Sequence, residues 1–289
     1  MNIVTDSGTD IGLNAEELAH FNIHVVPLKV TLDGKTYHDG EDIETESFYN
    51  SLDTSGTMPI TSQPSAGDFA KLYSKLAAID PDILSVHMTA GLSGTFHAAL
   101  AGAEIVPEAK VIHIDTKTLS AAAGWQVIAA AKAFKDGLKI DKILETLTQI
   151  RDASESMYTL QELKYLISGG RISHMKGLIA SLLDIKPLIG VEKLNGTYIQ
   201  LGQARTFKKA LQGLVDRVKT HHPLGSPIHA QVLHAFNPDG GSMLRDMIDK
   251  AFDCTWLPLR PMSLVLGAHT GRSMVGVAFA STDKVGGLI

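Results

Sequence analysis

Small hydroxyl residues between Ile83 and Ile105 have the types and spacing that could bind an anion. This stretch predicts a strand, then a loop of small residues from Thr89 to Leu92, then a helix opened by Ser93-Gly94-Thr95. Backbone N–H groups and two hydroxyls would then lie at the carboxyl end of a parallel strand, where open α/β sheets bind ligands. Because a helix N-terminus favours negative charge, the pattern indicates an oxyanion or carboxylate site, with a structural turn as the alternative.

Three further positions could contribute to such a site. The segment Thr61-Ser62-Gln63-Pro64-Ser65 precedes a predicted helix with Ser65 as its N-cap, and alone it is typical of a capped turn. Arg171 follows Gly169-Gly170 and could hold a phosphate or a partner's carboxylate, or be a solvated charge at a helix end. His269 follows the apolar run Leu264 to Leu266, interpreted as a strand. It would suit a carboxylate or acyl phosphate, with a structural histidine as the alternative.

Several segments resemble known functional motifs but lack a residue or a spacing that the motif requires. Gly34-Lys35-Thr36 resembles the end of a nucleotide-binding loop, but Lys29 stands where the first glycine should be. Gly91-Leu92-Ser93-Gly94-Thr95 lacks the final glycine of a nucleophile elbow. His221 and His222 are adjacent, so their side chains diverge and a shared metal is not expected. The sequence therefore predicts no nucleotide site, no metal site and no cofactor.

Composition narrows the class of protein further. The chain has 289 residues, of which 44% are hydrophobic and 20% charged, an ordinary globular mixture. A net charge of -5 offers no broad basic field for nucleic acid. The single cysteine, Cys254, cannot form an internal disulfide, which fits a reducing compartment. No signal peptide or membrane-length apolar run is visible, so we expect a soluble, cytoplasmic protein with no integral membrane segment.

The first half alternates strands and helices. Strands are expected at Ile3-Val4 and over 23–30, 83–88 and 111–115, and helices over 66–76, 95–105 and 120–134. This alternation implies βαβ units, a parallel sheet and helices on both faces. A polar stretch over 151–156 suggests a boundary, with an α/β domain over 1–153 and a second domain over 154–289.

The second half predicts a mixed α+β domain. Thr159 to Glu162 matches a capping box, and Gly169-Gly170 would end the helix that it begins. Met175 to Leu183 carries an apolar helical stripe. Lys193 to Tyr198 predicts a hairpin with Asn-Gly in a type I′ turn, and further strands are expected over 228–236 and 274–280.

Together these segments resemble the DegV family of bacterial fatty-acid-binding proteins over nearly the whole chain. The matching pieces are Val4-Thr5-Asp6-Ser7, Val26-Pro27-Leu28, Tyr37-His38-Asp39-Gly40, Thr61-Ser62-Gln63-Pro64-Ser65, Leu92-Ser93-Gly94-Thr95, Leu166-Ile167-Ser168-Gly169-Gly170-Arg171-Ile172, Lys186-Pro187 and Gly267-Ala268-His269-Thr270-Gly271. Each piece is short, but their order and spacing make a chance match improbable.

The resemblance implies one bound long-chain fatty acid, whose carboxylate is held by Thr61, Ser93 and His269. Ser62, Gly94 and Thr95 belong to the same binding loops. The acyl chain would lie in an apolar tunnel of the second domain, for which the stripe Met175 to Leu183 is a candidate wall, with plain core as the alternative. Some family members carry the acyl group for a fatty acid kinase. A separate ATP-binding subunit phosphorylates the carboxylate, and the acyl phosphate enters phospholipid synthesis.

In that arrangement this chain is a non-catalytic subunit, and Arg171 and Arg205 would lie on the surface that meets the kinase. The late family motif usually reads His-x-Gly-Pro-Gly, whereas this chain has Arg272-Ser273 after Gly271, which would place a charge near the head group. Two other functions stay open: a serine hydrolase of acyl esters, with Ser93 as nucleophile and His269 as base, and a lipid sensor or storage module without a kinase.

Overall fold

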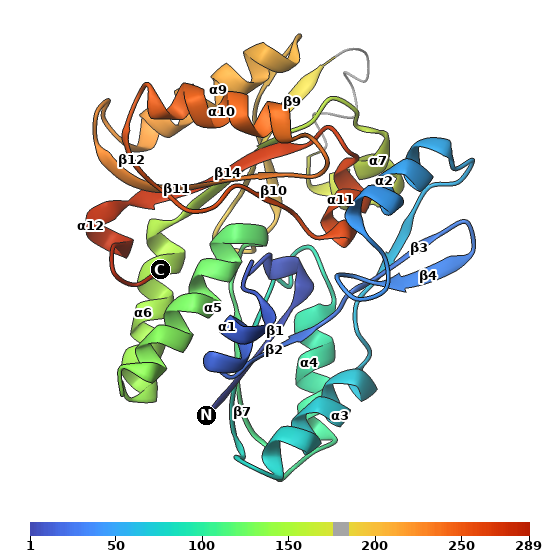
Figure 1. The fold of residues 1–289 in the computed structure, drawn as a ribbon, viewed down its shortest axis with the longest axis vertical. Helices are drawn as coiled ribbons and strands as arrows, with labels where there is room; N and C mark the ends of the chain where they lie inside the picture. Colours follow the sequence, from blue (N-terminus) through green and yellow to red (C-terminus); the bar gives the residue numbers. More distant parts are fainter. Residues whose placement is uncertain (176–184) are drawn as a thin grey trace.

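Three β-sheets and the helices packed on them form the part of the molecule that the structure describes (Figure 1). The structure is a computed structural model that describes residues 1–175 and 185–289. The elements of the first half are β1 (Asn2–Asp6), η1 (Ser7–Thr9), α1 (Ala15–His20), β2 (Ile23–Val26), β3 (Lys29–Leu32), β4 (Lys35–His38), α2 (Thr45–Thr54), β5 (Ile60–Ser62), α3 (Ala66–Ala77), β6 (Asp82–His87), α4 (Thr95–Glu104), β7 (Lys110–Asp115), α5 (Ser120–Lys135) and α6 (Ile140–Ala153). Those of the second half are β8 (Glu155–Thr159), α7 (Lys164–Ser168), η2 (Arg171–His174), β9 (Lys186–Val191), β10 (Tyr198–Ala204), α9 (Phe207–His221), β11 (Pro227–His234), α10 (Pro238–Asp249), β12 (Asp253–Trp256), β13 (Arg260–Pro261), α11 (Leu264–Thr270), β14 (Val275–Ser281) and α12 (Thr282–Val285).

The first sheet has the order β2-β1-β6-β7, and all of its strands are parallel. Helices α3 and α4 pack on one face through Phe69 and Ala99, and α5 and α6 pack on the other through Val127 and Leu147. This confirms the expected α/β architecture with both faces covered. Because β1 leads toward α1 on one face and β6 leads toward α4 on the other, the carboxyl ends of these two strands form a switch point, where such sheets bind ligands.

The second sheet is mixed, as expected for the second half. Its order is β10-β9-β8-β14-β11-β12, and β13 also pairs with β11. Helices α9 and α10 cover one face, while α5 packs against the other, where Trp125 Nε1 donates to Gln231 Oε1 at 2.8 Å. Helix α5 therefore lies between the two large sheets (Figure 1).

The third sheet, β4-β3-β5, corrects one predicted strand. The run 23–30 is divided at Pro27, which has no N–H for a sheet, into β2 of the first sheet and β3 of the third. The β3–β4 hairpin turns at Asp33 and Gly34, whose φ angles are 49° and 76°. Gly34 thus belongs to a hairpin turn, and Lys35 and Thr36 begin β4, so the segment is not a phosphate loop.

Three local predictions in the second half were wrong. Thr159 does not cap a helix, because it is the last residue of β8, pairs with Val275, and leaves the start of α7 without a side-chain cap. The hairpin between β9 and β10 is present, but its four-residue loop has a positive φ at Gly196 and not at Asn195, so it is not a type I′ turn. The run before His269 belongs to helix α11 and not to a strand. The prediction failed because all residues of this helix are buried, so the sequence shows no alternation of apolar and polar residues that would distinguish a helix from a strand.

Sheet membership changes between Ala153 and Glu155, yet the hydrophobic core crosses this point. The largest cluster combines Leu28 and Leu119 of the first half with Leu160 and Leu266 of the second. The division at 153/154 therefore stays a prediction. In the predicted stripe Met175 to Leu183, Met175 is buried in this cluster and the rest lies outside the described residues.

Candidate ligand site

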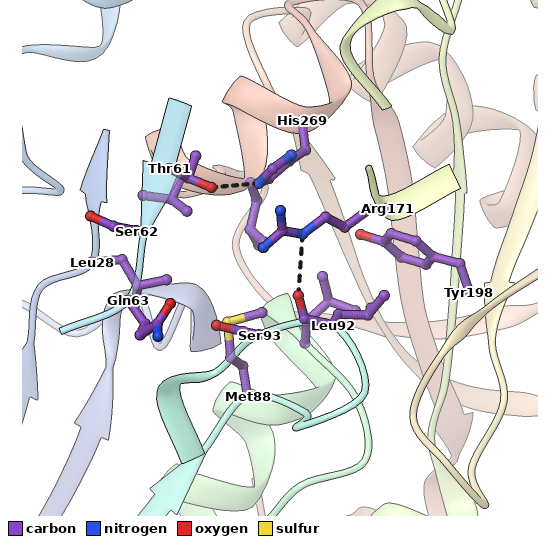
Figure 2. A pocket seen from close by; sticks show the side chains of 13 residues that line it. Leu28, Thr61, Ser62, Gln63, Met88, Leu92, Ser93, Arg171, Tyr198 and His269 are labelled. Atoms are coloured by element: carbon purple, nitrogen blue, oxygen red, sulfur yellow. Dashed lines mark hydrogen bonds between the residues drawn. The ribbon is translucent and has the colours of Figure 1, made fainter. Parts of the chain in front are cut away.

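A pocket beside the switch point brings most of the predicted site residues together (Figure 2). Its cavity has a volume of about 30 Å³, and all of the space between its lining atoms, open solvent included, amounts to about 400 Å³. Its lining comes from both halves of the chain: Leu28, Thr61, Ser62, Gln63, Met88, Leu92, Ser93, Leu119, Arg171, Tyr198, Val265, Leu266 and His269. Polar groups and aliphatic side chains thus meet in one cavity, which is the composition expected of a site for an amphipathic ligand.

The shortest polar contact in this lining joins Thr61 of β5 to His269 of α11. Thr61 Oγ1 and His269 Nε2 are 2.7 Å apart, and the imidazole is almost fully buried. Burial, and then the positive charge of Arg171, lower the pKa of His269 to about 4. The imidazole is therefore neutral near pH 7, and one of its nitrogens carries the proton.

The surroundings of the ring select between its two tautomers. Nδ1 is buried without a hydrogen-bond partner among the described residues, and it faces Gly169, where a Cβ would collide with it. Because a buried N–H without an acceptor is rarer than an unpaired lone pair, the proton belongs on Nε2. Nε2–H then donates to Thr61 Oγ1, and the Thr61 hydroxyl can donate its own proton into the pocket.

Ser93 reaches the pocket from the loop between β6 and α4. Its Oγ lies 2.8 Å from Thr95 Oγ1 and accepts a hydrogen bond from Thr95 N at 3.3 Å. Thr95 is fully buried and does not line the pocket, so it orients Ser93 instead of meeting a ligand. At Gly94 a Cβ would lie 2.8 Å from Gln63 Nε2, so this glycine lets the Gln63 amide pack beside the loop.

Arg171 lies between the pocket and a second, open depression. Its Nη1 donates to Gly169 O at 2.7 Å and its Nε donates to Leu92 O at 3.3 Å. In Figure 2 its guanidinium points into the space between His269 and Ser93. The depression has a volume of about 370 Å³ and shares three residues with the pocket, namely Leu92, Ser93 and Arg171. Its other lining residues are Ala90, Gly91, Gly94, His97, Gly169 and Gly170.

The structure separates the predicted site residues into three groups. Those lining the pocket are Thr61, Ser62, Ser93, His269 and also Arg171. Gly94 lines the outer depression, and Thr95 lies behind Ser93. Arg205 is exposed in the turn between β10 and α9 and lines neither cavity.

Sequence reasoning missed several lining residues. Met88, Leu119 and Tyr198 come from three separate segments, and their type carries no signal of a site. Position alone could have suggested Met88, because it directly follows strand β6 at the switch point.

The expectation that Arg272 adds charge near the head group was wrong. Its Nη1 pairs with Asp53 Oδ2, and its guanidinium lies 5.0 Å from the centroid of the Phe236 ring. The side chain is thus directed toward the end of α2 and lines neither cavity.

The arrangement is not that of a serine hydrolase. Within residues 1–175 and 185–289, no hydrogen bond joins Ser93 to His269, and no carboxylate orients His269 Nδ1. Over the same residues, no group of three or more potential ligands could hold a metal ion. No helix in the described part of the chain is long and apolar enough to cross a membrane.

The parallel sheet, the mixed sheet and the pocket at their junction define an α/β protein built around a small-molecule cavity. A family model described as an uncharacterised protein family, DegV, matches residues 1–282, and the chain belongs to this family. A DegV domain-containing protein of Staphylococcus aureus strain MRSA252 is 33% identical over 278 residues, which cover 95% of this chain and 96% of that protein.

Solved structures agree with this assignment. A DegV family protein from Thermus thermophilus, described as binding fatty acid, superposes with a TM-score of 0.87 at 28% identity, covering 97% of this chain and 99% of that one. DegV of Bacillus subtilis, described as a fatty acid binding protein, has a TM-score of 0.85 at 26% identity, covering 97% and 98%.

Proposed function

We propose that this protein binds one long-chain fatty acid and presents its carboxylate to a separate ATP-binding kinase. The observation that carries the proposal is the Thr61–His269 pair, which supplies a neutral donor set in a pocket that six apolar side chains also line. Related proteins of the same fold, at 26–28% identity, are described as binding fatty acids.

The aliphatic wall accounts for recognition of the acyl chain. The apolar side chains that line the pocket are Leu28, Met88, Leu92, Leu119, Val265 and Leu266. Burying about 16 methylenes at about 0.8 kcal/mol each gives roughly 13 kcal/mol of gross transfer free energy. Lost translational and conformational freedom offsets a large part of it.

The polar end accounts for recognition of the carboxylate. A buried carboxylate must be hydrogen-bonded, because an unpaired charge is costly in an apolar site. The Thr61 and Ser93 hydroxyls are the donors in this proposal, and Arg171 supplies positive charge in the same lining. A guanidinium held on two backbone carbonyls keeps its position while part of its donor set remains available.

Presentation to a kinase is supported by the shared wall of the two cavities. A carboxylate at Ser93 would lie next to the open depression, which Ser93 and Arg171 also line. In the proposed reaction a carboxylate oxygen attacks the γ-phosphorus of ATP bound to the partner, ADP leaves, and an acyl phosphate remains in the pocket. Arg171 and Arg205 are proposed to face that partner.

The binding part is tested by mass spectrometry of the purified protein, native and then denatured with solvent extraction. We expect about one fatty acid per chain, either co-purified or taken up on addition. A protein that is empty and takes up no fatty acid would contradict the proposal.

The kinase part is tested by acyl phosphate formation with the ATP-binding subunit from the same organism. Ser93→Ala should slow phosphate transfer roughly tenfold, the size expected for one hydrogen bond to a charged group. Ser74→Ala, on the exposed surface of α3, is the matched control and should transfer normally. Fatty acid binding without any transfer would instead favour a lipid sensor or storage protein.

A further inference from the structure

We infer that Asp10 and Asp39 are positioning residues for the carboxylate site, because together they fix the start of α11 and thereby the place of the His269 imidazole. The inference rests on the proposed function. Neither carboxyl touches the pocket: Asp10 follows η1 and Asp39 follows β4, and both are outside the lining that contains His269.

The two carboxyls bind consecutive backbone N–H groups where α11 begins. Asp10 Oδ1 accepts from Ser263 N at 2.7 Å, and Asp39 Oδ1 accepts from Leu264 N at 2.9 Å. Ser263 is the N-cap and accepts from Leu266 N through its own hydroxyl. Since α11 has only seven residues, fixing these first positions fixes the whole helix, including His269 in its last turn.

Each of these two residues is itself tied to a different part of the first half, Asp10 through its carboxyl and Asp39 through its backbone N–H. Asp10 Oδ2 accepts from the Ser120 hydroxyl at the start of α5. Asp39 N donates to Leu28 O at 2.9 Å, and Leu28 precedes β3, the strand that pairs with Thr61 in β5. The same small sheet therefore carries Thr61 and, through Asp39, the anchor of the helix that carries His269. This double attachment explains how two residues 208 positions apart in the chain meet at 2.7 Å.

The surroundings of these two carboxyls indicate which substitution preserves their role. Burial raises the pKa of Asp10 to about 8 and also raises the pKa of Asp39. Within the described residues neither forms an ion pair, and Asp39 Oδ2 is buried without a partner. An asparagine Oδ1 can accept the same bond from Leu264 N as the carboxyl oxygen does, so asparagine should replace Asp39 and alanine should not.

The experiment compares ligands that differ only at the head group. Dissociation constants for palmitate and for hexadecanol, which has the same chain length, are measured for the whole protein and for its Asp39→Ala, Asp39→Asn and Asp10→Ala variants. We expect both alanine variants to lose roughly tenfold in affinity for palmitate, with little change for hexadecanol. Asp39→Asn and the exposed control Asp246→Ala should bind both ligands normally.

A merely structural role would give a different result. Equal losses for palmitate and hexadecanol in the alanine variants would overturn the inference, and so would an Asp39→Asn variant as impaired as Asp39→Ala. If the alanine variants do not fold, Ser120→Ala removes the anchor of Asp10 and keeps its carboxyl. It should show a smaller loss for palmitate alone, and an equal loss for both ligands would again overturn the inference.

The His269 ring signal in nuclear magnetic resonance separates this inference from the proposed function. It is recorded without any ligand, and Asp39→Ala should shift it while Asp246→Ala should not. A shifted signal in a protein that binds no fatty acid would leave the positioning role standing and refute the proposed function. An unchanged signal in a protein that does bind fatty acid would refute the positioning role.

Discussion

His87 and His269 are both buried histidines next to hydroxyl residues, but their surroundings differ. His87 Nδ1 bonds Asp6 Oδ2 at 2.9 Å, and its Nε2 bonds Ser85 Oγ at 2.6 Å. Ser85 Oγ in turn bonds Tyr73 OH at 2.7 Å. This hydrogen-bond network around His87 contains the residue types of a hydrolase triad, yet every member is fully buried. Among the residues that the structure describes, His269 has one hydrogen-bond partner, Thr61, and it borders a pocket.

On the proposed function, partner saturation, more than residue type, separates a structural polar group from a ligand-binding one. The hydrogen-bond network around His87 connects β1, β6 and α3. Both ring nitrogens of His87 already have partners, so neither is available to a ligand. At the His269 end, the Thr61 hydroxyl retains a donor that faces the cavity. Both regions follow the same rule, that buried polar groups must be paired.

The largest expected effect comes from breaking the hydrogen-bond network around His87. His87→Ala would leave Asp6 and Ser85 buried without that partner, and we expect the free energy of unfolding to fall by about 3–5 kcal/mol. Urea denaturation measures this loss. The exposed His97 provides the control, since His97→Ala should stay within about 0.5 kcal/mol of the parent protein. If His87→Ala lowers the free energy of unfolding by less than about 1 kcal/mol, the hydrogen-bond network around His87 does not stabilise the fold.

The second effect concerns His269 and its contact with Thr61. Gly169→Ala would drive a methyl group into His269 Nδ1, so the ring must move away from Thr61. We expect palmitate affinity to fall roughly tenfold, which corresponds to one lost hydrogen bond to a charged group. Isothermal titration calorimetry checks this. Gly56→Ala is the control, because nothing lies within 4 Å of its Cβ position. Unchanged affinity in Gly169→Ala would mean that the ring position does not matter for binding.

The smallest effect is expected at Arg272. Its ion pair with Asp53 is substantially exposed, with side-chain exposures of 44% and 36%, and such pairs contribute about 0–1 kcal/mol. Arg272→Ala should therefore lower the thermal midpoint slightly and leave palmitate affinity unchanged. A clear loss of palmitate affinity would support the expectation from the sequence that Arg272 lies near the head group of the ligand.

Local chemistry made part of the site predictable. Ser65 caps α3 with a complete capping box, and Ser93-Gly94-Thr95 opens α4, because both signals depend on a few neighbouring residues. The parallel sheet followed from the alternation of apolar runs. The place of Arg171 inside the pocket lining did not, since it depends on Leu92 and Gly169 carbonyls brought together by packing. For the same reason the roles of Asp10 and Asp39 become visible only where α11 meets the first half.

One contact beside the pocket limits how it could be redesigned. A Cβ at Gly91 would collide with Asn195 O, and one at Gly196 would collide with Thr89 Oγ1, so the β9–β10 loop crosses the loop after β6 backbone to backbone. An engineer who wants a different acyl-chain preference can vary lining side chains such as Met88 or Leu119. At Gly91 and Gly196 the crossing leaves no room for a Cβ. Its two glycines are fixed parts of the scaffold, around which selectivity would have to be designed.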